Sequence, residues 1–203
     1  MQLEMKKLLL TSDGLSTEKI RKEFLKLVGK PAINIKVLYI PTAANVSENK
    51  SYVEIDKKNI FSVGISENNF IEFDLDNLGR NANFDEIDAI FIEGGNTYYL
   101  LKRVRETGFD KVLIKLLNRG AVYVGISAGS ILAGPDISIS QKENQFGLTD
   151  FTGLNLTNRA ISPHFQKKER GIINSFEERT NHKALPLNDG QALLILGDVE
   201  EII

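Results

Sequence analysis

The stretch Ala121-Val122-Tyr123-Val124-Gly125-Ile126-Ser127-Ala128-Gly129 decides the fold. Residues 121–126 are apolar at nearly every position, which is typical of a parallel strand that is buried on both faces. The small residues that follow predict a sharp turn into a helix, because larger side chains clash at such a bend. A strand that passes directly into a helix is the repeating unit of an α/β sheet, so we expect this class of fold.

Similar apolar segments, alternating with helical patterns, occur on both sides of this stretch. The other predicted strands are residues 6–12, 35–41, 68–75, 89–92 and, as the last strand of the chain, 192–196. The predicted helices are residues 16–28, 52–63, a segment that begins near 97, 109–118 and 170–179. Continuous apolar strands that alternate with helices predict a doubly wound α/β fold, in which a mostly parallel sheet carries helices on both faces.

The pattern weakens in the segment after the serine. Gly134-Pro135 interrupts the chain, residues 138–151 are polar, and two short apolar pieces, 154–156 and 159–161, suggest the edge of a sheet. The sequence contains no internal repeat, low-complexity tract or linker, and 203 residues of which 42% are hydrophobic supply one substantial core. We therefore expect a single domain over residues 1–203.

The composition argues against several classes of function. The 25 Lys and Arg against 27 Asp and Glu give a net charge of −2 and form no basic block, so we expect no nucleic acid and no membrane as partner. The absence of cysteine excludes thiolate chemistry, and the two histidines, His164 and His182, are too far apart in sequence for an H-x-x-x-H metal pair. We expect no metal and no other cofactor. Without a signal peptide or an apolar run of about 18 residues, a cytoplasmic location is expected.

Ser127 lies at the turn between the predicted strand and helix, within Gly125-Ile126-Ser127-Ala128-Gly129. This segment matches the G-x-S-x-G pattern in its expected strand–turn–helix context, which projects a serine hydroxyl beyond the end of the sheet. The amide of Ala128 is then a candidate oxyanion donor. The alternative is a tight connection that binds a phosphate or nothing, since serine and glycine are common in turns for conformational reasons alone.

A second turn, Glu93-Gly94-Gly95-Asn96, follows strand 89–92 and is expected at the same end of the sheet. Because a glycine amide approaches a ligand without steric hindrance, Gly95 is the second candidate oxyanion donor, and Asn96 beside it is a candidate substrate-binding residue. The alternative is a plain turn in which Asn96 caps the following helix.

A serine nucleophile needs a base, and Pro163-His164-Phe165 offers one, because the proline stiffens the segment and the aromatic ring can wall the imidazole. His182, in a polar segment, is interpreted as a surface residue. A carboxylate must orient the histidine and stabilise its charged form. Asp189, just before the last predicted strand, and Asp136, before the polar segment, are both candidates, and the residues alone leave this choice open.

Three segments in this order, Glu93 to Thr97, Gly125 to Gly129 and Ser162-Pro163-His164-Phe165, resemble the peptidase E family of serine peptidases (family S51), which includes aspartyl dipeptidases and, more distantly, cyanophycinase. The resemblance covers most of the chain and implies a fold similar to class I glutamine amidotransferases, a flavodoxin-like three-layer sandwich. It also implies the roles of the residues: Ser127 as nucleophile, His164 as general base, the Gly95 and Ala128 amides as the oxyanion hole, and Asp189, favoured over Asp136, as the third residue.

Arg170 follows a compact segment after the histidine. The resemblance implies that its guanidinium binds a substrate side-chain carboxylate, and the alternative is a surface arginine at the start of a helix. The resulting hypothesis is a metal-independent serine peptidase that acts on short peptides, with dipeptides that carry an N-terminal aspartate as one candidate substrate. An esterase or amidase with the same triad and a non-catalytic protein that binds a small ligand are the alternatives. Whether the chain is a monomer or a homodimer is left open.

Overall fold

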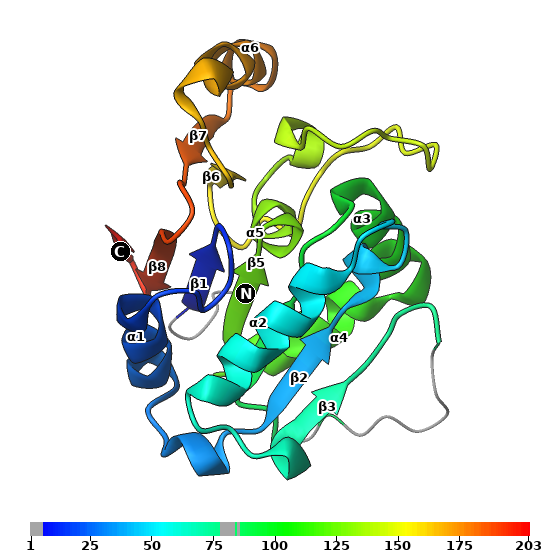
Figure 1. Cartoon of the computed structure of the whole chain (residues 1–203). Helices are drawn as coiled ribbons and strands as arrows, with labels where there is room; N and C mark the ends of the chain where they lie inside the picture. The colour runs from blue at the N-terminus through cyan, green and yellow to red at the C-terminus, as the bar shows by residue number, and fades with distance from the viewer. Residues whose placement is uncertain (1–5, 78–83, 85) are drawn as a thin grey trace.

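The computed structural model describes residues 6–77, 84 and 86–203, and its centre is a seven-stranded sheet in the order β3-β2-β4-β5-β1-β8-β9 (Figure 1). The strands of this sheet are β1 (Lys7–Thr11), β2 (Val37–Ile40), β3 (Phe70–Glu72), β4 (Ala89–Ile92), β5 (Val122–Ile126), β8 (Ala192–Leu196) and β9 (Val199–Ile202). The first five strands in the spatial order run parallel, β8 runs antiparallel to β1, and β9 runs antiparallel to β8. The predicted mostly parallel sheet is confirmed.

Helices cover both faces of this sheet. They are α1 (Glu18–Val28), α2 (Ser51–Ser62), α3 (Thr97–Thr107), α4 (Phe109–Asn118) and α5 (Ala128–Ala133), whereas α6 (Arg170–Thr180) lies away from this sheet (Figure 1). The 3₁₀ turns are η1 (Ala32–Asn34), η2 (Thr42–Ala44), η3 (Glu67–Asn69), η4 (Ile137–Ile139) and η5 (Lys167–Glu169). Within the described residues, none of the helices combines the length and the apolar character that crossing a membrane requires.

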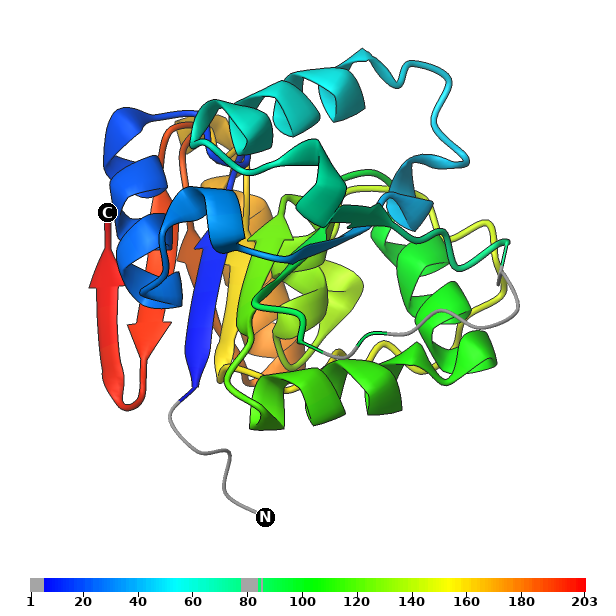
Figure 2. The same cartoon turned by 90° about the horizontal axis from the view of Figure 1, so that it is seen from below.

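The apolar residues of the strands divide between two cores, one on each face. Leu9 of β1 packs in the core formed with α1 and α2, whereas its neighbours Leu8 and Leu10 pack in the core formed with α3, α4 and α5. Figure 2 shows these two sets of helices on opposite faces of the sheet. Because side chains alternate between the faces of a strand, two covered faces require apolar residues at every position. This is the physical reason for the continuous apolar runs in the sequence.

Capping residues explain why α1 ends, and α3 begins, close to where the sequence predicts. Thr17 accepts a hydrogen bond from the Ile20 amide at the start of α1, and Gly29 ends this helix in the left-handed conformation with a φ of 70°. Asn96 caps α3 in the same way, and Gly108, with a φ of 69°, ends it. Such caps act between neighbours in the chain, so the sequence alone locates them.

Both edges of the sheet depart from the prediction. The strand predicted to be the last of the chain is β8, but β9 follows it and forms one edge. Gly197 has a φ of 61° between them, a left-handed conformation that lets the chain reverse within a short turn. All of β9 is exposed, so no buried apolar pattern marks it. At the other edge, β3 spans 70–72 instead of the predicted 68–75.

A second, two-stranded parallel sheet lies beyond the carboxyl ends of β1 and β5 (Figure 1). It consists of β6 (Arg159–Ser162) and β7 (Lys183–Pro186), which α6 connects. The piece 159–161, predicted at an edge of the main sheet, belongs to β6, and the piece 154–156 forms no strand. Because β6 packs against α5, its apolar residues reflect burial but do not reveal its partner strand.

Candidate active site

Ser127 occupies a strained position at the carboxyl end of β5. Its φ of 46° and ψ of −101° lie outside the regions that residues with a side chain prefer, a conformation that costs about 1–3 kcal/mol and that packing must enforce. A Cβ at Gly125 would lie 2.6 Å from the Ser130 amide nitrogen, and one at Gly129 would lie 2.1 Å from the Ile92 carbonyl oxygen. The glycines on both sides of the serine are therefore required sterically.

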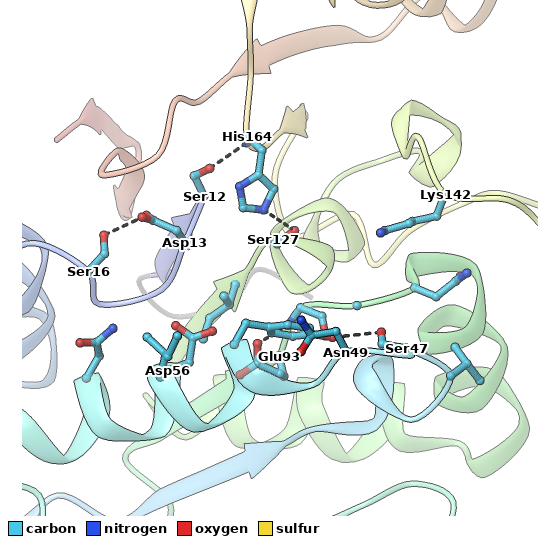
Figure 3. A pocket seen from close by; sticks show the side chains of 18 of the residues that line it. Ser12, Asp13, Ser16, Ser47, Asn49, Asp56, Glu93, Ser127, Lys142 and His164 are labelled. Carbon is cyan, nitrogen blue, oxygen red and sulfur yellow. Dashed lines mark hydrogen bonds between the residues drawn. The ribbon is translucent and has the colours of Figure 1, made fainter.

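The imidazole of His164 connects the Ser127 hydroxyl to a carboxylate. His164 follows β6 closely, and its Nε2 lies 3.0 Å from Ser127 Oγ while its Nδ1 lies 2.6 Å from Asp189 Oδ1. Ser12, at the end of β1, donates its hydroxyl to the same Asp189 oxygen (2.8 Å) and accepts the His164 amide (2.8 Å), as Figure 3 shows in part. Four segments that are far apart in the sequence thus meet in one continuous hydrogen-bonded chain.

The backbone amides of Gly95 and Ala128, both near Ser127, donate no hydrogen bond within the described part of the chain. Gly95 has a φ of 141°, and a Cβ there would lie 2.1 Å from the Ala43 carbonyl oxygen, so only glycine fits. The turn is close to the serine, because a Cβ on Gly94 would lie 3.4 Å from Ser127 Cβ. Free amides beside a serine hydroxyl are the elements of an oxyanion hole.

The model of peptidase family S51 matches residues 8–203, which is nearly the entire chain. The chain belongs to peptidase family S51. It is therefore a peptidase, and a hydrolase by class.

Named relatives of this family S51 peptidase agree with that assignment. The chain is 30% identical to the uncharacterized peptidase Lmo0363 of Listeria monocytogenes, with 95% of this chain and 96% of that protein covered. It is also 30% identical to the peptidase E of Streptomyces coelicolor over 58% of this chain and 52% of the relative. A crystal structure of a candidate peptidase E from Listeria monocytogenes EGD-e superposes with a TM-score of 0.79 at 27% identity, with 98% of both chains covered.

Two cavities meet at the serine of this peptidase, and both are lined by Gly95, Ser127, Lys142 and His164. The larger has a volume of about 780 Å³ and the smaller about 260 Å³. Acidic side chains gather in the larger one: Asp13, Glu48, Asp56 and Glu93. A volume of several hundred cubic ångströms is typical of a site for a small ligand.

Asp136, which the sequence offers as an alternative to Asp189, does not contact the histidine. Its carboxylate accepts the Ser138 amide (2.7 Å) and caps the 3₁₀ turn η4. Of the two candidate carboxylates, the one within hydrogen-bonding distance of His164 is that of Asp189. The sequence alone could not distinguish a capping role of Asp136 from a catalytic one, because aspartate is common in both.

The two predicted substrate-binding residues also have other contacts. The guanidinium of Arg170 lies 5.0 Å from the centroid of the Phe165 ring, and the residue lines neither cavity, so the geometry does not support its predicted contact with a substrate carboxylate. Asn96 does line the larger cavity. Its side-chain oxygen caps α3, and its amide nitrogen donates to the Glu143 carbonyl (3.3 Å), which leaves little of it for a ligand.

Residues after β1 were missed by the sequence analysis. Ser12 bonds both Asp189 and the His164 amide, and Asp13 accepts the Gly190 amide (2.9 Å) and the Ser16 hydroxyl (2.9 Å). Together they tie the Asp189 loop to the central strand. Their position at the carboxyl end of a parallel strand was the available signal, since ligands bind at that end of such sheets.

A buried pair of carboxyl groups, Glu93 and Asp56, was missed as well. Burial raises the pKa of Glu93 to about 8, and repulsion from Asp56 adds to this; burial also raises the pKa of Asp56 to about 6, while a hydrogen bond from Glu93 opposes that rise. Glu93 Oε1 accepts the Gly94 amide (2.6 Å), and its other oxygen accepts the Tyr39 hydroxyl. At neutral pH the pair holds a proton and anchors the turn that carries Gly95.

No cluster of three or more His, Asp or Glu side chains that would hold a metal ion exists among the residues the structure describes.

Proposed function

We propose that the protein is a serine peptidase that hydrolyses short peptides through Ser127, His164 and Asp189. The observation that carries this proposal is the pair of contacts on one imidazole, 3.0 Å to the serine hydroxyl and 2.6 Å to the aspartate. A histidine that bonds a hydroxyl on one side and a carboxylate on the other is arranged to remove the hydroxyl proton. The family supports peptide hydrolysis as the reaction.

The reaction begins when Ser127 Oγ attacks the scissile carbonyl carbon and His164 Nε2 takes the hydroxyl proton. The carbonyl oxygen gains negative charge and accepts hydrogen bonds from the Gly95 and Ala128 amides, each worth about 3–4 kcal/mol in such chemistry. Asp189 stabilises the imidazolium through Nδ1. His164 then protonates the leaving amine, and a water molecule, deprotonated by the same imidazole, releases the acyl group from Ser127.

Dipeptides with an N-terminal aspartate are one candidate substrate within this class. Arg170 does not support that preference, because it stacks on Phe165 outside both cavities. The combined size of the cavities, about 780 Å³ and 260 Å³, favours peptides of a few residues.

Ser127→Ala tests the nucleophile. We expect a folded variant that no longer turns over a dipeptide library and no longer reacts with a fluorophosphonate probe, whereas the wild type is labelled at Ser127. Ser62→Ala, at an exposed position at the end of α2, is the matched control and should behave as the wild type. Peptide turnover by Ser127→Ala at the wild-type rate would exclude the proposal.

The same experiment separates the alternatives. Turnover of p-nitrophenyl esters without any turnover of peptides would indicate an esterase. Failure of the wild type to react with the fluorophosphonate would indicate a non-catalytic binding protein, because an unactivated serine does not attack such probes.

A further inference from the structure

Lys142 is placed where a ligand on either side of the reacting serine would meet it. Of the residues that the structure describes, it is one of four that line both cavities, and the other three belong to the proposed catalytic machinery: Gly95, Ser127 and His164. Figure 3 shows its side chain extending from its loop toward the serine. It lies 15 positions after Ser127 in a polar segment where sequence patterns single out no residue.

The ammonium group of Lys142 has no hydrogen bond and no ion pair in the described part of the chain. Several other lysines form ion pairs, among them Lys22 with Glu18 and Lys102 with Glu106. Of the carboxyls that line the larger cavity, Asp13 bonds backbone and serine donors, and Glu93 contacts Asp56, Tyr39 and the Gly94 amide; none is paired with Lys142 within the described residues. A positive charge at the site is therefore left without a partner.

A second, independent observation comes from Thr97 in the smaller cavity. Thr97 is 1% exposed, and its hydroxyl has no hydrogen-bond partner among the described residues. A buried hydroxyl without a partner is destabilising, so its presence in a cavity wall points to a ligand atom that accepts a hydrogen bond. Thr97 lines the same cavity as Lys142.

The other residues that line the smaller cavity suit a short ligand with an apolar part and a terminal hydrogen-bond acceptor. Ile131, Ile139 and Pro163 supply apolar surface. The carboxylate in this wall is that of Glu169, and it accepts the Gln166 amide (2.8 Å) as part of a capping arrangement. In the larger cavity, by contrast, several carboxyls would repel a second negative charge.

We propose that Lys142 and Thr97 form a carboxylate-binding subsite in the smaller cavity. Lys142 supplies a charge-assisted hydrogen bond and Thr97 a neutral one, both to oxygens of the ligand. This inference rests on the proposed function and names part of the substrate: a short peptide with a carboxylate close to the scissile bond. That carboxylate is either the side chain of an acidic residue or the C-terminal group of a dipeptide.

The test uses two pairs of dipeptides that differ in one carboxylate. Asp-Leu and Asn-Leu differ in the side chain, and Leu-Leu and Leu-Leu amide differ at the C-terminus. For the carboxylate-bearing member of one pair, Lys142→Gln should raise KM by about 10- to 100-fold, the range of a hydrogen bond to a charged group, with little change in kcat. The KM of its neutral partner should not change. The pair that responds identifies the source of the carboxylate.

Three further variants make the test specific. Lys142→Arg keeps the charge and should retain most of the affinity, and Thr97→Val, which keeps the shape, should raise KM for the same substrate by about tenfold or less. Lys168→Gln is the matched control, because Lys168 is an exposed lysine that lines neither cavity. The proposal would be overturned if, within both pairs, the ratio of the two KM values were the same for the wild type and for Lys142→Gln. It would also be overturned if Lys142→Gln raised KM equally for the carboxylate-bearing and the neutral peptides.

Failure of this proposal is distinguishable from failure of the proposed function. Fluorophosphonate labelling of Ser127 in Lys142→Gln should proceed at the wild-type rate, because the probe carries no carboxylate. Binding of the same dipeptides to Ser127→Ala, measured by calorimetry with and without Lys142→Gln, needs no turnover. A weaker Kd only for the carboxylate-bearing peptides supports the subsite, and an unchanged Kd for all of them contradicts it.

Discussion

The carboxyl groups near Ser127 differ in their exposure to solvent: Asp189 is exposed, whereas Glu93 and Asp56 form a buried pair. The side chain of Asp189 is 62% exposed and contacts His164, whereas Glu93 is fully buried and shares its environment with Asp56. Water reaches the side chain of Asp189, whereas the pair of Glu93 and Asp56 is buried. In the buried pair the desolvation penalty raises both pKa values, and the pair retains a proton. Of these three carboxyl groups, Asp189 is the one placed to balance an imidazolium, because it contacts His164.

The exposed carboxylate and the buried pair act on different parts of the site. Asp189 and Ser12 orient the imidazole from the β1 side. The buried pair acts on the backbone, because Glu93 accepts the Gly94 amide and thereby holds the turn of Gly95. A charged group suits the first task and a protonated, hydrogen-bonded group suits the second.

The largest expected effect comes from replacing Asp189. Asp189→Asn should lower kcat/KM by about 10⁴-fold, because the amide favours the wrong tautomer of the histidine and cannot stabilise its charge. Asp56→Asn is the matched variant in the buried pair, and we expect its kcat/KM to stay within about tenfold of the wild type, since it does not touch the imidazole. Steady-state kinetics on one dipeptide measures both. Equal losses would remove the distinction between the exposed carboxylate and the buried pair.

The next effect concerns stability as a function of pH. The pKa of Glu93 is 4.5 in its unperturbed state and about 8 in the fold, so between these values the folded state binds more protons than the unfolded one. The free energy of unfolding should therefore fall as the pH rises through this window, by a few kcal/mol in all. Glu93→Gln cannot titrate and should flatten this slope.

Urea denaturation of the wild type and of Glu93→Gln at a series of pH values measures that slope. A Glu93→Gln variant that keeps the full slope between pH 5 and pH 8 would show that the buried pair does not cause it.

The smallest effect should come from Ser12, which supports the exposed carboxylate. Ser12→Ala removes the hydroxyl that bonds Asp189 and the His164 amide, and we expect a loss of about tenfold in kcat/KM, the size of one hydrogen bond. Ser16→Ala is its control: that hydroxyl bonds Asp13 and should matter less than about threefold. If Ser12→Ala lost as much as Asp189→Asn, orientation and not charge would be the main role of the aspartate.

The sequence patterns predicted the parts of the fold that depend on local interactions. Continuous apolar runs identified β1, β2, β4 and β5, and caps such as Thr17 and Gly29 placed the ends of α1. The same patterns failed for β6, whose apolar residues face α5, and for β9, which is exposed throughout. A run of apolar residues indicates that a strand is buried. The direction of the strand and its partner in the sheet depend on residues far along the chain.

For the site, the sequence by itself determined the glycines and the serine, because the bend at Ser127 and the turn at Gly95 admit only small residues. The tertiary structure alone decided which carboxylate meets His164, and it alone brought Ser12 within 2.8 Å of a residue 177 positions away. The physical reason is that backbone strain and capping act between neighbours in the chain, whereas hydrogen bonds between loops form only after the sheet has assembled and placed the ends of its strands together. Interactions between neighbours in the chain do not distinguish Asp136 from Asp189. The hydrogen bonds between loops do, because Asp189 is the one of the two that meets His164.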